Sequence, residues 1–150
     1  MDRTYLLFIL FTVTLFLSSC GKGRSIVDPD AHLSKYSYAT VYQAEKAGFE
    51  ELELMNIFRT RGFSIIGSGE IVENKTIGVR YLYENDGEYY SITCTIIDAT
   101  TKKTLASLEG KGGKFNLWTG HVHSNKEKAK EQLLAELDKV VPKISADNNH

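Results

Sequence analysis

The sequence has few of the residues that crosslink a chain, stiffen it or carry it through a membrane. It contains two cysteines and two prolines in 150 residues, and its longest apolar run covers only residues 5–17. A bilayer-spanning helix takes about 20 predominantly apolar residues, so this run is short for a transmembrane segment. An uncleaved signal anchor stays open as an alternative.

Charge of one sign is also missing. The formal net charge is −1, which argues against a surface for nucleic acid or polyphosphate. The composition is 42% hydrophobic and 11% aromatic, and a chain with this much apolar material does not belong to the disordered class. We therefore expect a folded body that does not bind nucleic acid.

The N-terminal residues have the layout of a secretory signal. A charged start, an apolar run and small residues follow one another before Cys20. The segment Leu17-Ser18-Ser19-Cys20 resembles the lipobox of bacterial lipoproteins, in which the signal is removed and the cysteine becomes the lipid-bearing first residue. The resemblance implies a signal peptide over residues 1–19 and a covalent lipid with palmitate-type acyl chains on Cys20. Two acyl chains hold a protein firmly on a membrane.

The rest of the chain divides into a tether, one domain and a tail. Residues 21–34 show no periodicity and contain Gly, Pro and Ser. We expect residues 20–34 to be a lipidated N-terminus followed by a flexible tether. Residues 35–142 carry the periodic patterns and form a single domain, and the polar residues 143–150 form a disordered tail.

Alternating and helical patterns predict the elements of this domain. Asp86-Gly87 is a turn pair typical of β-hairpins, Gly62 suits the left-handed end of a helix, and Ser124 with Glu127 forms a capping box. The patterns predict strands over residues 36–42, 63–66, 76–84, 89–98 and 104–109, and helices over residues 47–61 and 124–141. The segment 115–123 is ambiguous.

This order of strand, helix, four strands and helix predicts an α+β fold. We expect a two-layer sandwich with a mostly antiparallel sheet of about five strands and two helices on one face. The other face of the sheet would be partly open to water. Cys94 alternates with two isoleucines in the run Ile92-Thr93-Cys94-Thr95-Ile96, which favours a small buried hydrophobe over a reactive thiol.

The candidates for chemistry are few. His121 and His123 would point the same way in a strand, but two ligands fall short of the three or four that zinc sites use. The segment 110–114, Gly-Lys-Gly-Gly-Lys, lacks the phosphate-loop spacing and is better explained as a flexible turn or a glycine-bent strand. No Gly-x-Ser-x-Gly elbow is present, although a Ser–His–Asp arrangement assembled by folding stays open. We expect no catalytic residue, no metal and no cofactor besides the lipid.

Aromatic side chains are the surface feature with the most promise. If they line the helix-free face of the sheet, they form a patch of the kind enriched at protein interfaces. The alternative is that they are cross-strand pairs covering the sheet. The candidate partner-binding residues are Tyr36, Tyr38, Tyr42, Tyr81, Tyr83 and Trp118.

The order of motifs resembles a class of small Gram-negative envelope lipoproteins. It comprises the lipobox, a strand beginning Lys35-Tyr-Ser-Tyr, a helix closing with Arg-Gly-Phe63, the motif Ile97-Asp98-x-Thr-Thr-Lys, and a glycine-rich segment before the last helix. Some of these lipoproteins share an α/β architecture with lipoprotein activators of peptidoglycan synthases.

The resemblance implies a non-enzymatic accessory protein of the cell envelope. Its domain would face the periplasm and bind another envelope component, with a protein as the expected partner. In such families the residue after the cysteine influences sorting, and Gly21 is not the aspartate associated with retention in the inner membrane, so the outer membrane is favoured. The alternative is a periplasmic hydrolase or metal-dependent enzyme that uses His121 and His123.

Overall fold

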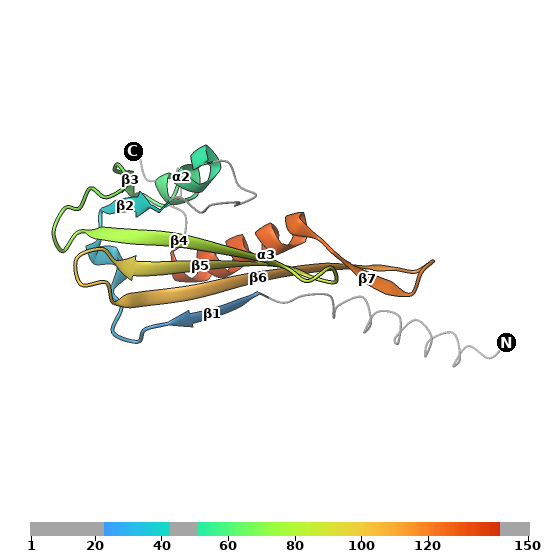
Figure 1. Cartoon of the computed structure of the whole chain (residues 1–150). Helices are drawn as coiled ribbons and strands as arrows, with labels where there is room; N and C mark the ends of the chain where they lie inside the picture. Colours follow the sequence, from blue (N-terminus) through green and yellow to red (C-terminus); the bar gives the residue numbers. More distant parts are fainter. Residues whose placement is uncertain (1–22, 43–50, 142–150) are drawn as a thin grey trace, which may run out of the picture.

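A mixed β-sheet with helices packed against it makes up the described residues, 23–42 and 51–141, of the computed structural model (Figure 1). The strands are β1 (Arg24–Val27), β2 (Tyr38–Val41), β3 (Ser64–Ile65), β4 (Thr76–Asn85), β5 (Tyr90–Asp98), β6 (Thr104–Asn116) and β7 (His121–Ser124). The α-helices in these ranges are α2 (Glu51–Arg59) and α3 (Lys126–Val140), and a short 3-10 helix covers Leu33–Lys35.

The strands lie in the order β1-β6-β5-β4-β2-β3, and β7 pairs with the far end of β6. The α+β class is therefore confirmed, but the sheet has seven strands in the described residues and is not purely antiparallel. β2 runs parallel to both β3 and β4. The helix α2 lies between β2 and β3 in the chain, and a connection through a helix brings the next strand back in the same direction.

The two strands beyond the predicted five are β1 and β7. Residues Arg24–Val27, which the sequence placed in a flexible tether, form edge strand β1 and pair with Ala106–Glu109 of β6. Ile26 and Val27 stay exposed, so β1 has no apolar alternation for a sequence pattern to detect. Most of β7 lies in the segment 115–123, which the sequence patterns left ambiguous. With four residues, β7 is too short for its alternation to be recognised.

One core fills the space between the sheet and the helices. The helix α3 contributes Ala129, Leu133 and Leu137, and α2 contributes Phe58, which is fully buried. The helix-facing strand residues alternate along each strand, as side chains on one sheet face must. They are Ala39, Val41, Ile77, Val79, Tyr81, Ile92, Cys94, Ile96, Ala106 and Leu108. None of the helices in the described ranges is long and apolar enough to cross a membrane.

Two glycines let α3 lie directly on β6. A Cβ atom at Gly110 would fall 2.0 Å from the carbonyl oxygen of Ala129, and one at Gly112 would fall 2.0 Å from that of Asn125. No side chain fits at either position, so the helix backbone approaches the strand backbone closely. The segment 110–114 therefore lies within strand β6. Of the two alternatives for this segment, a flexible turn or a glycine-bent strand, the flexible turn is wrong and the strand is confirmed.

The helix ends agree with the sequence in one case and differ in the other. Gly62 has a φ of 88°, and the amide of Phe63 donates to the carbonyl of Phe58, as in the predicted glycine-terminated helix end. The prediction that Ser124 caps the last helix is wrong, because Ser124 is the last residue of β7 and pairs with Gly113. Asn125 caps α3 instead, and its side chain accepts a hydrogen bond from the Lys128 amide.

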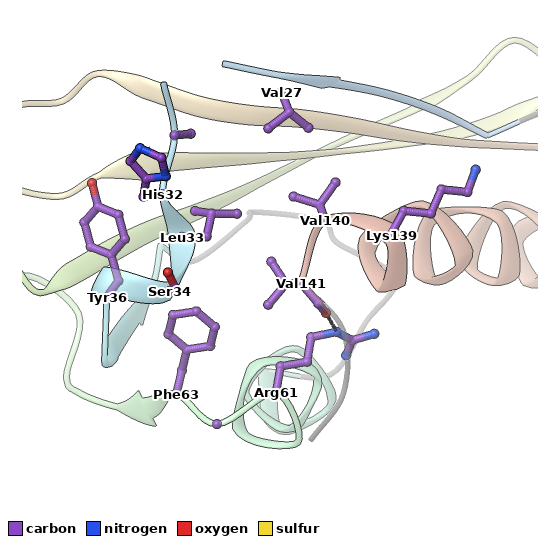
Figure 2. A pocket seen from close by; sticks show the side chains of 12 residues that line it. Val27, His32, Leu33, Ser34, Tyr36, Arg61, Phe63, Lys139, Val140 and Val141 are labelled. Atoms are coloured by element: carbon purple, nitrogen blue, oxygen red, sulfur yellow. Dashed lines mark hydrogen bonds between the residues drawn. The ribbon is translucent and has the colours of Figure 1, made fainter. Parts of the chain in front are cut away.

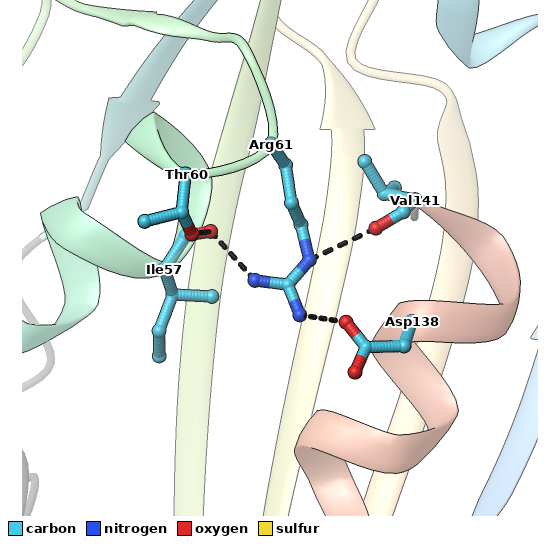
Figure 3. A network of polar contacts seen from close by, with 5 residues as sticks. All are labelled: Ile57, Thr60, Arg61, Asp138 and Val141. Atoms are coloured by element: carbon cyan, nitrogen blue, oxygen red, sulfur yellow. Dashed lines mark hydrogen bonds and ion pairs between the residues drawn. The ribbon is translucent and has the colours of Figure 1, made fainter. Parts of the chain in front are cut away.

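A buried arginine joins the two helices (Figure 3). Arg61 is 5% exposed, and its guanidinium donates to the Val141 carbonyl at 2.9 Å and to the Ile57 carbonyl at 2.7 Å. It also forms an ion pair with Asp138 of α3. The planar guanidinium satisfies carbonyl groups at the ends of both helices, so it fixes the end of α2 against the end of α3.

Candidate functional site

The helix-free face of the sheet is not covered by the described helices. We call it the open face. One row crosses four strands, because Arg80 pairs with Thr95, Thr95 with Ser107 and Ser107 with Ile26. Tyr42 extends this row beyond β4, since the Arg80 guanidinium lies 5.1 Å from the centre of its ring. The small hydroxyl side chains of Thr95 and Ser107 therefore occupy the middle of this row. Larger side chains, those of Arg80 with Tyr42 and of Ile26, lie at its two ends.

A second row on the open face carries charge and an exposed apolar side chain. Leu82 pairs with Thr93, Thr93 pairs with Glu109, and Glu109 pairs with Arg24. The Arg24 guanidinium is 3.0 Å from the Glu109 carboxylate. Leu82 is 58% exposed and has no core to enter on this side. The open face thus combines flat hydroxyl-bearing strands with charged and apolar groups at its margins.

The six aromatic candidates do not gather into one patch. Tyr36 and Tyr81 are buried in the core on the helix-facing side, and Tyr83 packs against that core with its ring centre 6.4 Å from that of Tyr90. Tyr38 and Tyr42 are half-buried and share the parity of the open face. The hypothesis of a continuous aromatic sheet face therefore does not describe the arrangement, because β4 turns its tyrosines toward the helices.

Tyr36 forms a buried hydrogen bond with Asp98, the last residue of β5. Its hydroxyl donates to Oδ2 of Asp98 at 2.7 Å, while Oδ1 accepts from the amides of Thr100 and Thr101. Burial disfavours the charged carboxylate, but the hydrogen bonds from Thr101, Tyr36 and Thr100 outweigh it and lower the pKa of Asp98. Burial, together with the hydrogen bond to Asp98, raises the pKa of Tyr36 above its ordinary value.

Beside this contact lies an open cavity of about 600 Å³ (Figure 2). Its apolar wall includes Leu33, Phe63 and Val140, and its polar groups include Arg61 and Lys139. Arg61 is bonded to protein carbonyls and to Asp138, and Lys139 forms an ion pair with Glu136. Both cations thus already have partners: Arg61 links the two helices, and Lys139 pairs with a residue of its own helix.

The two histidines lie on the β6–β7 hairpin. His121 pairs with Asn116 and His123 with Lys114, and both histidines are exposed. Among residues 23–42 and 51–141, no group of three or more His, Cys, Asp and Glu side chains is placed to hold a metal ion. Cys94 is 1% exposed, as expected for a small buried hydrophobe, and burial raises the pKa of its thiol to about 12.

The tip of the β6–β7 hairpin is a feature that the sequence patterns did not single out. Trp118 is 98% exposed and Leu117 is 84% exposed. Trp118 was a candidate only as one member of an aromatic patch, whereas the structure places it apart from the other five. The available signal was the Leu-Trp pair followed by Thr-Gly between the end of β6 and the short strand β7, which is the composition of a hairpin loop presenting apolar side chains.

The hairpin tip is held in shape by hydrogen bonds from its backbone amides to Asn116. The amide of Trp118 donates to Oδ1 of Asn116 at 2.9 Å, and the amide of Gly120 donates to the Asn116 carbonyl at 2.9 Å. Gly120 has a φ of 67°, in the left-handed region that favours glycine. The turn therefore does not depend on packing of the Leu117 and Trp118 side chains. The lipid-attachment candidate, Cys20, lies outside the described residues.

Comparisons with known proteins give distant structural likeness only. No protein-family model matches the chain, and no curated protein matches it. Two solved structures of PelC from Paraburkholderia phytofirmans, both dodecamers, are similar over 81% of this chain and 95% of theirs. The identity is 12% in both cases, with TM-scores of 0.43 and 0.40.

Proposed function

We propose that this chain is a lipid-anchored protein of the bacterial cell envelope, held on the outer membrane by a lipid on Cys20 with its domain in the periplasm. The observation that carries the proposal is the segment Leu17-Ser18-Ser19-Cys20 directly behind an apolar run of signal-peptide length. Each buried methylene contributes about 0.8 kcal/mol, so two acyl chains give stable anchoring. Gly21, which is not an aspartate, supports the outer membrane.

The domain acts as a non-enzymatic accessory module that binds a protein partner through the open face. The hydroxyl side chains of Thr93, Thr95 and Ser107 lie between the exposed apolar side chains of Leu82 and Ile26. Non-obligate interfaces are about as apolar as the rest of a protein surface and carry about ten hydrogen bonds. A flat face that mixes hydroxyls, charges and isolated apolar groups fits that description.

The anchor is tested by replacing the cysteine. The variant Cys20→Ala has no thiol to carry a lipid, so we expect it to leave the membrane fraction or to persist as the unprocessed precursor. The unaltered chain should sediment with membranes and show a lipid mass on residue 20 by mass spectrometry. A processed Cys20→Ala chain that stays in the membrane fraction as firmly as the unaltered one would contradict the proposal.

The partner surface is tested by site-specific photocrosslinking in intact cells. A crosslinkable residue at Thr95 lies at the centre of the open face, and one at Glu73, exposed in the segment between β3 and β4, serves as the matched control. We expect a discrete protein adduct from position 95 that Arg80→Glu abolishes and that position 73 does not give. Equal adducts from both positions would exclude the open face as the specific surface.

The enzyme alternative rests on His121 and His123, and no observation in the described residues favours it. Under the proposal, the double variant His121→Ala and His123→Ala keeps the adduct from position 95 and the cellular phenotype of the unaltered chain. Loss of the phenotype in a folded double variant would support the enzyme instead.

A further inference from the structure

The β6–β7 hairpin and the start of the described chain lie toward the same end of the sheet. β1 runs antiparallel to β6, and Arg24 pairs with Glu109, so the chain enters the sheet from the side toward which β6 leads. Gly112 is the last β6 residue that pairs with β5, and beyond it only β7 continues alongside β6. Figure 1 shows the hairpin extending past the turn between β4 and β5.

The distances along the chain place this hairpin within reach of the anchoring membrane. Arg24 is four steps along the chain from Cys20, and a fully extended chain of that length spans at most about 14 Å. Asn116 is seven steps from Glu109, which is about 23 Å of strand. When the hairpin points toward the bilayer, its tip therefore extends about 9 Å or more beyond the level of Cys20. Interfacial segments bury their apolar groups to a depth of about 5–10 Å.

The chemistry of the tip suits a lipid headgroup region. Leu117 and Trp118 are almost fully exposed, and tryptophan is enriched where membrane meets water because its ring is apolar and its N–H can stay hydrogen-bonded. The stretch 110–126 contains three lysines and no Asp or Glu, although acidic residues slightly outnumber basic ones in the whole chain. The adjacent β4–β5 turn carries Asp86 and Glu88, so an anionic membrane surface would attract the lysines of the hairpin itself and not this whole end of the molecule.

We propose that the tip of the β6–β7 hairpin, Leu117 with Trp118, inserts into the headgroup region of the leaflet that holds the lipid on Cys20. This inference rests on the proposed lipid anchor and adds a second, weaker contact. The lipid holds the chain on the surface, and the hairpin sets the orientation of the domain, with the long strands directed away from the membrane. The open face then stands upright beside the bilayer, where a periplasmic partner reaches it.

The chain carries its own probe, because Trp118 is its single tryptophan. The lipidated mature protein is reconstituted in vesicles of phosphatidylethanolamine and phosphatidylglycerol, with or without lipids brominated high on the acyl chains. We expect Trp118 emission to shift to shorter wavelength, to lose most of its intensity with brominated lipids and to become protected from iodide. Flotation of the same vesicles reports the anchor separately.

Two variants of matched character sharpen the test. Leu117→Asp places a charge at the tip and keeps the probe, so quenching by brominated lipids should fall sharply while flotation is unchanged. Ile71→Asp removes an exposed apolar side chain from the segment between β3 and β4 and should leave quenching as in the unaltered chain. Leu117 and Ile71 are both exposed and lie outside the strands, so neither substitution should reduce the thermal stability of the domain.

The outcomes separate the two proposals. A chain that floats while Trp118 emits as in water and stays open to iodide overturns the hairpin insertion and leaves the anchor standing. A blue-shifted Trp118 that brominated lipids do not quench also overturns it, because the tip is then covered by protein, either a second copy or another partner. A chain that does not float overturns the anchor itself.

Discussion

Asp98 is the residue at which the turn between β5 and β6 meets the segment that leads into β2. Its carboxylate accepts hydrogen bonds from two turn amides and from the Tyr36 hydroxyl. The motif Ile97-Asp98-x-Thr-Thr-Lys is therefore a structural turn in this protein. Its side chain is 6% exposed, so the bonds it makes are shielded from competing water.

Replacing Asp98 by Asn tests how much this carboxylate stabilises the fold. Asn keeps the volume but loses the charge-assisted bonds, so Asp98→Asn should lower the free energy of unfolding by about 1–3 kcal/mol at neutral pH. The native pKa of Asp98 is lowered, so its contribution is complete above the unfolded-state pKa near 3.8. It is lost as the pH falls through the lower native pKa. Urea denaturation from pH 7 to pH 3 measures both effects.

The control for this prediction is Tyr36→Phe, which removes one of the three bonds. It should cost about 1 kcal/mol and leave most of the acid dependence in place, because the amides of Thr100 and Thr101 still bind the carboxylate. An equal loss in the two variants at every pH would show that the turn amides contribute nothing specific.

Single residues differ in how far the sequence predicts their surroundings. The burial of Cys94 follows from its alternation with Ile92 and Ile96, since side chains two apart share a sheet face. Tyr36 and Tyr81 were placed on faces by the same rule, but the rule does not say which face the helices cover. Their burial is decided by the packing of α3 and α2, which no local pattern contains.

At the scale of elements, the packing of α3 against β6 depends on the absence of side chains at two positions. Gly112→Ala would place a methyl carbon 2.0 Å from the Asn125 carbonyl oxygen, so the helix must move away from the strand. Overpacking of this kind typically costs about 1–3 kcal/mol. We expect a lower melting temperature by circular dichroism and weaker protection of α3 amides in hydrogen exchange.

A matched glycine outside this contact serves as the control. A Cβ at Gly67 would meet only the side chain of Glu70, at 3.1 Å, and a flexible side chain can move. Gly67→Ala should therefore leave the melting temperature nearly unchanged. Equal destabilisation by both substitutions would show that loss of glycine, and not the close approach of α3, is responsible.

The joint between α2 and α3 depends on the shape of one side chain. Arg61 bonds Val141, Ile57 and Asp138 at once, and a lysine ammonium cannot reach three separated acceptors with the same planar geometry. Arg61→Lys should lower the free energy of unfolding by about 1–3 kcal/mol, since buried carbonyls lose their donors. Chemical denaturation measures it. Arg59→Lys, at an exposed arginine of α2, should have almost no effect.

The elements themselves were predictable where a pattern was long. Strands β4 and β5 and helix α3 follow from alternation or helical spacing over nine residues or more. β1 and β7 have four residues each, and pairing with β6 stabilises them instead of burial of their own side chains. The extension of β6 through its glycines was one of two alternatives that the sequence left open, because glycine marks a turn as well as a close approach of another backbone.

At the scale of the whole molecule, the charges and the apolar groups are distributed unevenly. The β6–β7 hairpin has lysines without acids between residues 110 and 126, although the β4–β5 turn beside it carries Asp86 and Glu88. The opposite end carries the cavity beside Arg61 and Tyr36. The short link from Cys20 to β1 joins the proposed anchor to the hairpin side. Under the proposed anchor and the proposed hairpin contact, these positions give the domain a single orientation on the membrane without any rigid connection to the lipid.

The membrane on which the chain resides should depend on residue 21 and not on the fold. Under the proposed lipid anchor, Gly21→Asp introduces the residue that the lipobox resemblance associates with retention in the inner membrane, so we expect the chain to move from outer-membrane to inner-membrane fractions in a density gradient. Gly21→Ala is the control and should stay in the outer membrane. Both variants should melt at the same temperature as the unaltered chain, because every core residue of the described ranges lies beyond position 21 in the sequence. If Gly21→Asp stays in the outer membrane while Cys20→Ala is released, the lipid alone determines attachment and another part of the chain determines sorting.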